Sequence, residues 1–133
     1  MMIRPLLVLM ATVFPAMVFP APPLAAADCP VERSGDTISD ALEKAPSCDA
    51  AMKVFEACAY VASIDVQFGA TVTEKCEATF LPRLSPAQRK TYDREQEACT
   101  RKYIKQDGSM YRSFEAFCHA KLARAYARRL ASP

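Results

Sequence analysis

The stretch SPAQRKTYDREQEACTRKYIKQDGSMYRSFEAFC, residues 85–118, decides the fold of this chain. It opens with Ser85 before Pro86, and Gln88 follows three residues after the serine. A serine at the cap, a proline in the first turn and a glutamine at the third helical position are typical of a helix start. The pattern predicts a helix that runs to about Gln106.

A turn and a second helix follow in the same stretch. Asp107-Gly108 predicts the stop, and Ser109 predicts the next start. Cys99 lies nine residues before Gly108 and Cys118 ten residues after it. Two antiparallel helices joined at this turn bring the cysteines to the same height. We therefore expect a helical hairpin stapled by a Cys99–Cys118 disulfide.

The sequence on both sides of the hairpin also has helical periodicity. The stretch Thr37-Ile38-Ser39-Asp40 resembles a capping box and predicts a short helix that Pro46 ends; Ser47 predicts the next start. Apolar side chains then recur at spacings of three and four: Met52, Phe55, Cys58, Ala59, Ala62, Val66, Val72, Cys76 and Phe80. The predicted core stripe of the last helix is Tyr111, Phe114, Cys118, Leu122, Tyr126 and Leu130. The predicted fold class is all-α, a small bundle of about four helices in one domain, 28–133.

The first 27 residues have a different composition. A basic start (1–4), an apolar run (6–14) and small residues at 24–27 occur in the order of a secretory signal peptide. The run is shorter than the roughly 20 residues that a membrane-spanning helix needs. Lipidation at Cys29 is disfavoured because Asp28 stands where a small residue is wanted. We expect cleavage after Ala27 and export of a soluble monomer to the periplasm or the medium.

All six cysteines lie beyond this leader, and an even number in an exported chain predicts three disulfides. They are Cys29, Cys48, Cys58, Cys76, Cys99 and Cys118. Nearly equal spacings favour pairing in sequence order (29–48, 58–76, 99–118), although six cysteines allow 15 connectivities. In one straight helix Cys58 and Cys76 would lie about 27 Å apart. Their pairing needs a fold-back near Gly69, and a continuous helix would give each another partner.

Charge divides the mature chain into two halves. Residues 28–77 carry a net charge of −6 and residues 78–133 a net charge of +7. The halves attract each other when packed, or each serves a different partner. Arg124, Arg128 and Arg129 complement the dipole of the last helix or favour anionic envelope polymers. Nucleic acid is not an expected partner, because the aromatic residues follow core spacing and are not interleaved with the basic ones.

The chain has few residues suited to catalysis. Its one histidine, His119, follows a cysteine that is expected to be bonded. No close cysteine pair, phosphate loop or nucleotide motif indicates a metal or another cofactor. Asp93, Glu95 and Glu97 could form a carboxylate pair but alternate along a helix rich in basic residues, which favours a solvated face. We expect a protein without enzymatic activity and without cofactors.

The C-terminal half resembles the LprI lysozyme-inhibitor family, whose members are small exported bacterial helical domains. Gln88-Arg89 is followed by Cys99 at eleven residues, Gly108-Ser109 makes the turn, and Cys118 is the second cysteine. Leu122, Arg124 and Leu130 close the last helix. Cys29 and Cys48 match an early cysteine pair of the family.

The resemblance implies a binding protein that inhibits lysozyme. Acidic side chains facing a basic enzyme would be its physical basis. The candidate contacts lie in the acidic half: Asp28, Glu32, Asp36, Asp40 and Glu43. The alternative is an envelope or stress-associated protein that binds anionic polymer or unfolded clients through its basic half.

Overall fold

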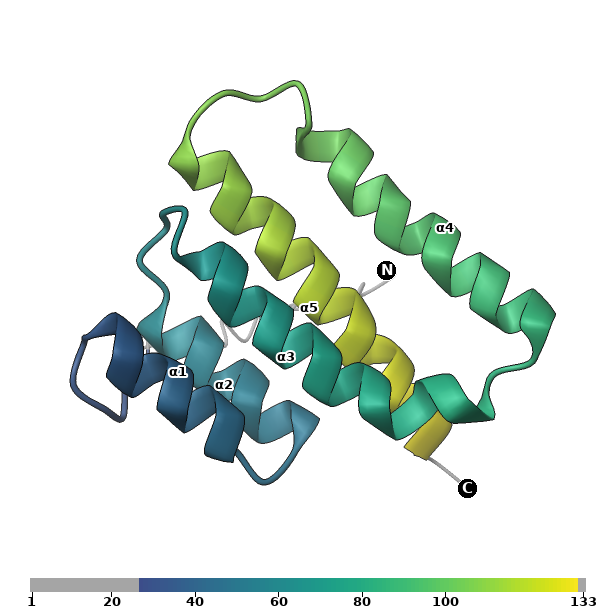
Figure 1. Ribbon diagram of the computed structural model, residues 1–133, viewed down its shortest axis with the longest axis horizontal. Helices are drawn as coiled ribbons and strands as arrows, with labels where there is room; N and C mark the ends of the chain where they lie inside the picture. Colours follow the sequence, from purple (N-terminus) through teal and green to yellow (C-terminus); the bar gives the residue numbers. More distant parts are fainter. Residues whose placement is uncertain (1–26, 132–133) are drawn as a thin grey trace, which may run out of the picture.

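The computed structural model describes residues 27–131, and every regular element in that range is helical. The described residues form five α-helices, one more than the four or so that the sequence predicts, and a 3-10 turn joins two of them; Figure 1 shows their arrangement. They are α1 (Gly35–Lys44), α2 (Cys48–Cys58), α3 (Asp65–Phe80), η1 (Leu81–Arg83), α4 (Pro86–Tyr103) and α5 (Ser109–Ala131). The predicted all-α class is confirmed. The predicted signal peptide, 1–27, lies outside the described residues except for its last position.

Serine side chains begin three of the helices. Ser47 accepts a hydrogen bond from the amide of Ala50, and Ser85 forms the full capping box with Gln88. Both starts agree with the prediction. The start of α1 does not, because its cap is Ser34, whose hydroxyl accepts from the Thr37 amide.

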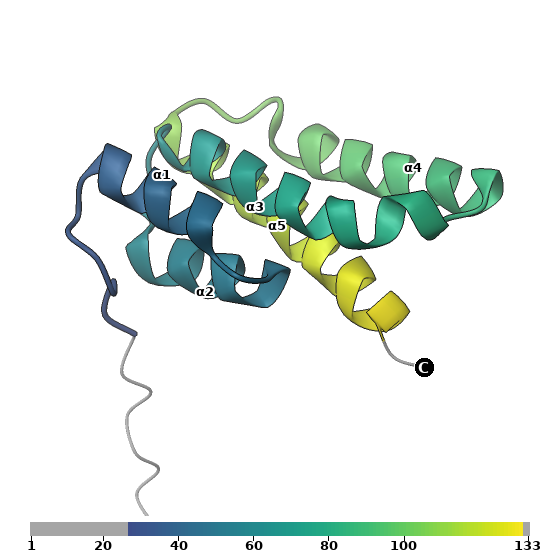
Figure 2. The same cartoon turned by 60° about the horizontal axis from the view of Figure 1, so that its bottom comes forward.

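The helices form two layers, with α1, α3 and α4 above α2 and α5 (Figure 2). Helix α3 packs along α5 at the centre, α1 and α2 cover one side, and α4 lies on the other (Figure 1). The largest fully buried apolar side chains fill the space between the layers: Tyr92, Phe55, Phe68, Phe80, Ile38, Leu42, Met52 and Val72.

The three disulfides join Cys29 to Cys58, Cys48 to Cys76 and Cys99 to Cys118. The hairpin bridge is confirmed, whereas the predicted pairs 29–48 and 58–76 are wrong. Helix α1 lies between Cys29 and Cys48 in the chain and carries them apart, and α3 is one continuous helix that keeps Cys76 away from Cys58. Helix α2 therefore has one bridge at each end.

Gly69 does not break a helix; it lets α3 and α5 approach closely. A methyl group added there would lie 2.8 Å from the Ala116 Cβ and 3.0 Å from the Ala116 carbonyl oxygen. The break instead falls at 59–64, before α3, where Val61 has a positive φ of 56°. Asp65 holds this loop: it is fully buried and accepts hydrogen bonds from the Tyr60 and Ala62 amides.

The buried face of α5 is not the predicted aromatic stripe. Of that stripe, Tyr126 is buried, whereas Phe114 is 37% exposed. The buried positions of α5 are mostly small: Ser113, Ala116, Ala120, Ala123, Tyr126 and Ala127. Because α3 comes so close at Gly69, alanines fit this interface and larger side chains turn to the edges of the helix. Among residues 27–131 no helix is both long enough and apolar enough to cross a bilayer.

Candidate functional site

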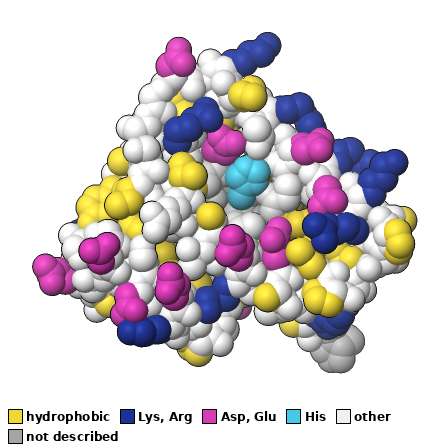
Figure 3. Space-filling model, viewed as in Figure 1, with side chains coloured by type: hydrophobic (Ala, Val, Ile, Leu, Met, Phe, Trp, Pro, Cys, Tyr) yellow, Lys and Arg dark blue, Asp and Glu magenta, His cyan; other side chains and the backbone are white. Residues whose placement is uncertain are grey.

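A valley lies between α3 and α4, and α5 forms its floor. Its wider section has a volume of about 550 Å³ between α3 and α5, and a section of about 410 Å³ continues beside α4. Thr73, Glu77 and His119 line both sections, so the two are continuous. Figure 3 shows the histidine near the middle of this face with acidic side chains around it. The valley brings together residues from three helices that follow one another in the sequence.

The floor of the wider section is small and apolar. Gly69 and Ala70 of α3 meet Ala116 of α5 there. These residues leave space because none has a side chain larger than a methyl group. The close packing of α3 against α5 therefore also makes the valley.

A chain of hydrogen bonds crosses the valley. Gln96 bridges His119 and Tyr92: its side-chain oxygen pairs with the histidine Nδ1 and its amide nitrogen with the tyrosine hydroxyl. The hydroxyl of Tyr92 donates in turn to Glu77 Oε1 at 2.7 Å. Since the amide oxygen of Gln96 can only accept, the Nδ1 atom of His119 is the donor. In each of these three hydrogen bonds the donor lies on the His119 side and the acceptor on the Glu77 side.

Tyr92 keeps its proton in this arrangement. Burial and the hydrogen bond to Glu77 raise the pKa of the Tyr92 hydroxyl well above its ordinary value. The ring also packs edge-on against Phe80, with centroids 5.1 Å apart. Glu77 is therefore held by a neutral donor, and the Arg89 guanidinium interacts with its charge at longer range.

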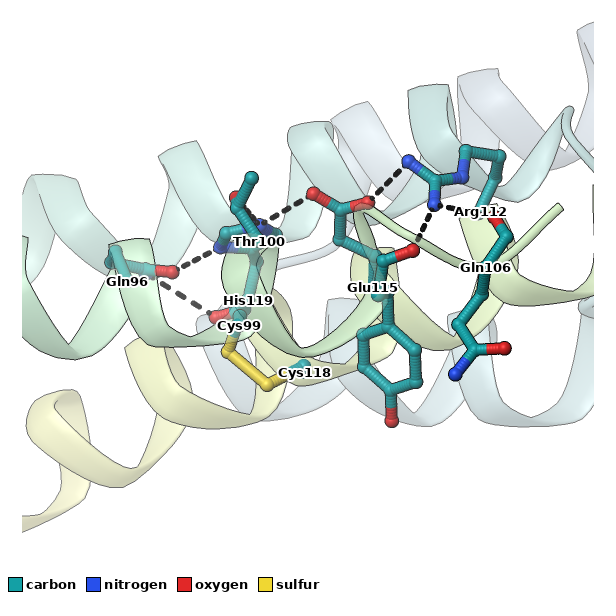
Figure 4. A network of polar contacts seen from close by, with 9 residues as sticks. Gln96, Cys99, Thr100, Gln106, Arg112, Glu115, Cys118 and His119 are labelled. Atoms are coloured by element: carbon teal, nitrogen blue, oxygen red, sulfur yellow. Dashed lines mark hydrogen bonds and ion pairs between the residues drawn. A yellow bond between two sulfur atoms is a disulfide. The ribbon is translucent and has the colours of Figure 1, made fainter.

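A second set of polar contacts fixes Glu115 on the floor (Figure 4). The Arg112 guanidinium lies 2.9 Å from Glu115 Oε2 and also donates to the Tyr103 and Gln106 carbonyls. On the other side, His119 Nε2 lies 3.7 Å from Glu115 Oε1 and 3.3 Å from the Thr100 hydroxyl. Both ring nitrogens of the histidine are thus engaged.

The valley carries more acid than base. Glu74, Glu77 and Glu115 line the wider section, against the one guanidinium of Arg112. Glu74 is exposed and has no ion pair or side-chain hydrogen bond within residues 27–131. On the α4 wall Asp93 is paired with Arg89 and Glu97 with Arg101.

The five acids predicted as partner contacts are all exposed. Asp36, Asp40 and Glu43 form one stripe along α1, and Asp28 and Glu32 lie in the segment before it. Figure 3 shows acidic side chains gathered over α1 and α3 on the same face as the histidine. Of the five carboxylates, that of Asp40 is paired, with Lys44 at 2.6 Å; within the described range the others have no ion pair. We call this surface, the α1 stripe together with the valley, the acidic face.

Part of the basic half is neutralised by acids of the same molecule. Asp49 of α2 receives Arg124 at 2.6 Å and Arg128 at 2.7 Å, so the end of α5 is tied to the acidic half. These contacts hold the pKa of the Asp49 carboxyl below its ordinary value, with the Arg128 hydrogen bond the largest cause. Arg129 lies over the Tyr126 ring at 4.2 Å. The arginines predicted to complement the helix dipole thus also make specific contacts.

A second groove, of about 480 Å³, lies between α4 and α5. Tyr103, Phe114 and Phe117 line it, together with Lys102 and Lys121. Lys102 lies 5.1 Å from the centre of the Tyr103 ring, and Lys121 lies 5.4 Å from the centre of the Phe117 ring. Its character is aromatic and basic, opposite to that of the valley.

The sequence did not predict the valley. In the sequence His119 stands out only as the neighbour of a cysteine expected to be bonded, and Gln96, Arg112 and Glu115 belong to no motif. Their helical spacing gives one usable signal, because Arg112, Glu115 and His119 follow each other at three and four residues on one face of α5. Within residues 27–131 no three His, Cys, Asp or Glu side chains are grouped so that they could hold a metal ion.

No known family, curated protein or solved structure matches this chain. The resemblance to the LprI family stays a prediction that rests on the residues of the hairpin.

Proposed function

We propose that this chain is an exported binding protein that uses its acidic face to bind a basic protein. Lysozyme, the partner implied by the LprI resemblance, is the first candidate. The observation that carries the proposal is the group of exposed acids on one face of the molecule. Asp36, Asp40, Glu43 and Glu74 are all exposed there, and of these four Asp40 alone has an ion pair within residues 27–131.

Export is supported by the leader pattern and by the pairing of all six cysteines. No free cysteine is found in residues 27–131, and disulfides persist in oxidising compartments. Non-enzymatic binding is supported by the state of Cys118. This neighbour of the one histidine is bonded to Cys99, so its sulfur is not available as a nucleophile.

The test is binding and inhibition of lysozyme by the oxidised mature chain, 28–133, at about 20 mM and about 150 mM salt. We expect affinity that falls as salt rises. The variant Asp36→Asn, Asp40→Asn, Glu43→Gln removes the α1 stripe and should weaken binding about tenfold. A variant with the same net charge, Glu56→Gln, Glu95→Gln, Asp107→Asn, alters acids outside the acidic face and should bind like the parent. Equal loss in both variants, or no binding at either salt, would contradict the proposal.

The second groove supports a second candidate, binding of anionic envelope polymer or of unfolded clients. Lysines beside exposed aromatic rings suit both ligands, and Phe114 is 37% exposed. Co-sedimentation with peptidoglycan or lipopolysaccharide at low salt tests the polymer. Loss of pelleting in Lys102→Gln, Lys121→Gln would support this function, and no pelleting of the parent would count against it.

A further inference from the structure

We infer that the valley is the binding site for an extended basic segment of the partner, with one lysine or arginine side chain lying over the Gly69–Ala116 floor. The inference rests on the proposed function and specifies its chemistry. The α1 stripe would attract a basic surface, whereas the valley would take hold of one side chain.

The shape of the floor favours a slender side chain. With Gly69, Ala70 and Ala116 beneath it, the valley has room for an aliphatic stem. The tyrosine that lines the valley, Tyr92, packs edge-on against Phe80 and does not frame a pocket for a ring. Val66, at the rim, is 47% exposed and does not cover the floor. The methylene groups of a lysine or arginine bury apolar surface along such a floor while the charged end stays at a polar rim.

The charge of the rim selects a cation. Within residues 27–131 Glu74 is exposed without a partner, and Glu77 accepts a neutral hydroxyl and has no ion pair, so two carboxylates one helical turn apart on α3 are available to a cation. An acidic or phosphorylated segment would be repelled by both. A hydrogen bond from an ammonium or guanidinium group to a carboxylate is roughly twice as strong as one between neutral groups.

Two carboxylates of the valley, Glu77 and Glu115, are also held in place before a ligand arrives. The series of hydrogen bonds from His119 through Gln96 and Tyr92 ends on Glu77. Arg112 fixes Glu115 from the opposite side (Figure 4). Side chains that are already ordered lose less conformational entropy on binding. This order distinguishes the valley from the α1 stripe, whose carboxylates mostly have no contacts.

His119 makes the test direct, because the chain contains one histidine and its imidazole resonances report on the valley alone. The probe is an N-acetylated hexalysine peptide, added to the oxidised mature chain and followed by NMR. We expect saturable shifts of the His119 ring signals. Hexaglutamate should cause none.

Two alanines of α3 supply a matched pair of variants. Ala70 lines the valley, Ala78 does not line it, and both are exposed. Ala70→Leu should fill the floor and weaken hexalysine binding at least about tenfold, while Ala78→Leu leaves it unchanged. Glu74→Gln should weaken it about threefold, and Asp107→Asn should not. Circular dichroism and thermal unfolding of each variant show whether it is folded.

Hexalysine that leaves His119 unshifted, or that binds Ala70→Leu as tightly as Ala78→Leu, would overturn the inference. If lysozyme binding is nevertheless lost on neutralising the α1 stripe, the proposed function stands and the valley is not its anchor. If the α1 variant also binds lysozyme like the parent, both are wrong.

Discussion

Helices α3 and α4 both lie against α5, and they are held there in different ways. Helix α3 buries Phe68, Val72, Cys76 and Phe80 along its length, and Gly69 lets its backbone approach α5. Helix α4 is longer, yet its buried residues are Tyr92 and Cys99. Its ties to α5 also include the disulfide, aromatic contacts such as Tyr103 with Phe114, and polar contacts such as Tyr126 with Glu95.

The difference shows how a small domain can keep an open surface. Close packing of small residues makes α3 and α5 one unit, while a disulfide keeps α4 in place without a broad apolar interface. The space between α3 and α4 is then left open. The polar chain from His119 to Glu77 links the α4 wall to the packed unit.

The largest expected effect is on the packed side. Replacing Cys48 and Cys76 together by alanine should lower the free energy of unfolding by about 4 kcal/mol, because the bridge is buried and closes a long loop between α2 and α3. Urea unfolding followed by circular dichroism measures the loss. A change below about 1 kcal/mol would mean that packing alone holds α2 against α3.

Opening the hairpin should cost less and act locally. The double variant Cys99→Ala, Cys118→Ala is expected to lose about 2 kcal/mol, because α4 buries little surface of its own. Limited proteolysis should cleave the variant first within α4. Cleavage spread evenly over all helices would show that α4 and the packed unit unfold together.

Gly69→Ala tests the close approach of α3 and α5, because helix propensity and packing predict changes of opposite sign in the free energy of unfolding. Helix propensity alone predicts that alanine stabilises an α-helix by about 1 kcal/mol relative to glycine. The added methyl group would instead lie 2.8 Å from the Ala116 Cβ, so we expect a loss of about 1–2 kcal/mol. Thermal unfolding decides, and a higher melting temperature would contradict the close approach.

The smallest effect concerns the tie between α5 and α2. The pKa of Asp49 is lowered by Arg128 and Arg124, so the stability that this carboxylate contributes is present at neutral pH and is lost as pH falls through its folded-state pKa. The side chain is 45% exposed, so we expect Asp49→Asn to cost no more than about 0.5 kcal/mol at pH 7. Unfolding measured from pH 7 to about pH 2 should show the parent and the variant converging. If the difference in unfolding free energy between parent and variant stayed constant with pH, the Asp49 charge would not be its cause.

Local signals in the sequence predicted the hairpin, its caps and its disulfide, because Ser85, Gly108 and two equidistant cysteines act within one short stretch. The other two disulfides depend on how α1 and α2 lie in space, which equal spacings do not determine. The predicted core face of α5 was also wrong. Gly69 of α3 brings the two helices so close that alanines of α5 fit between them, and the sequence of α5 alone does not show this. The valley draws on three helices and has no sequence motif.

Hydrogen exchange of the oxidised chain, resolved by helix, tests the central contrast most directly. The amides of α3 and of the part of α5 beneath it should exchange through global unfolding, and those of α4 through a local opening at least about 1 kcal/mol lower in free energy. Hexalysine at saturation should raise the protection of α4 toward that of α3. Equal protection of α3 and α4 in the free chain would contradict the claim that α4 is held less tightly than the packed unit of α3 and α5.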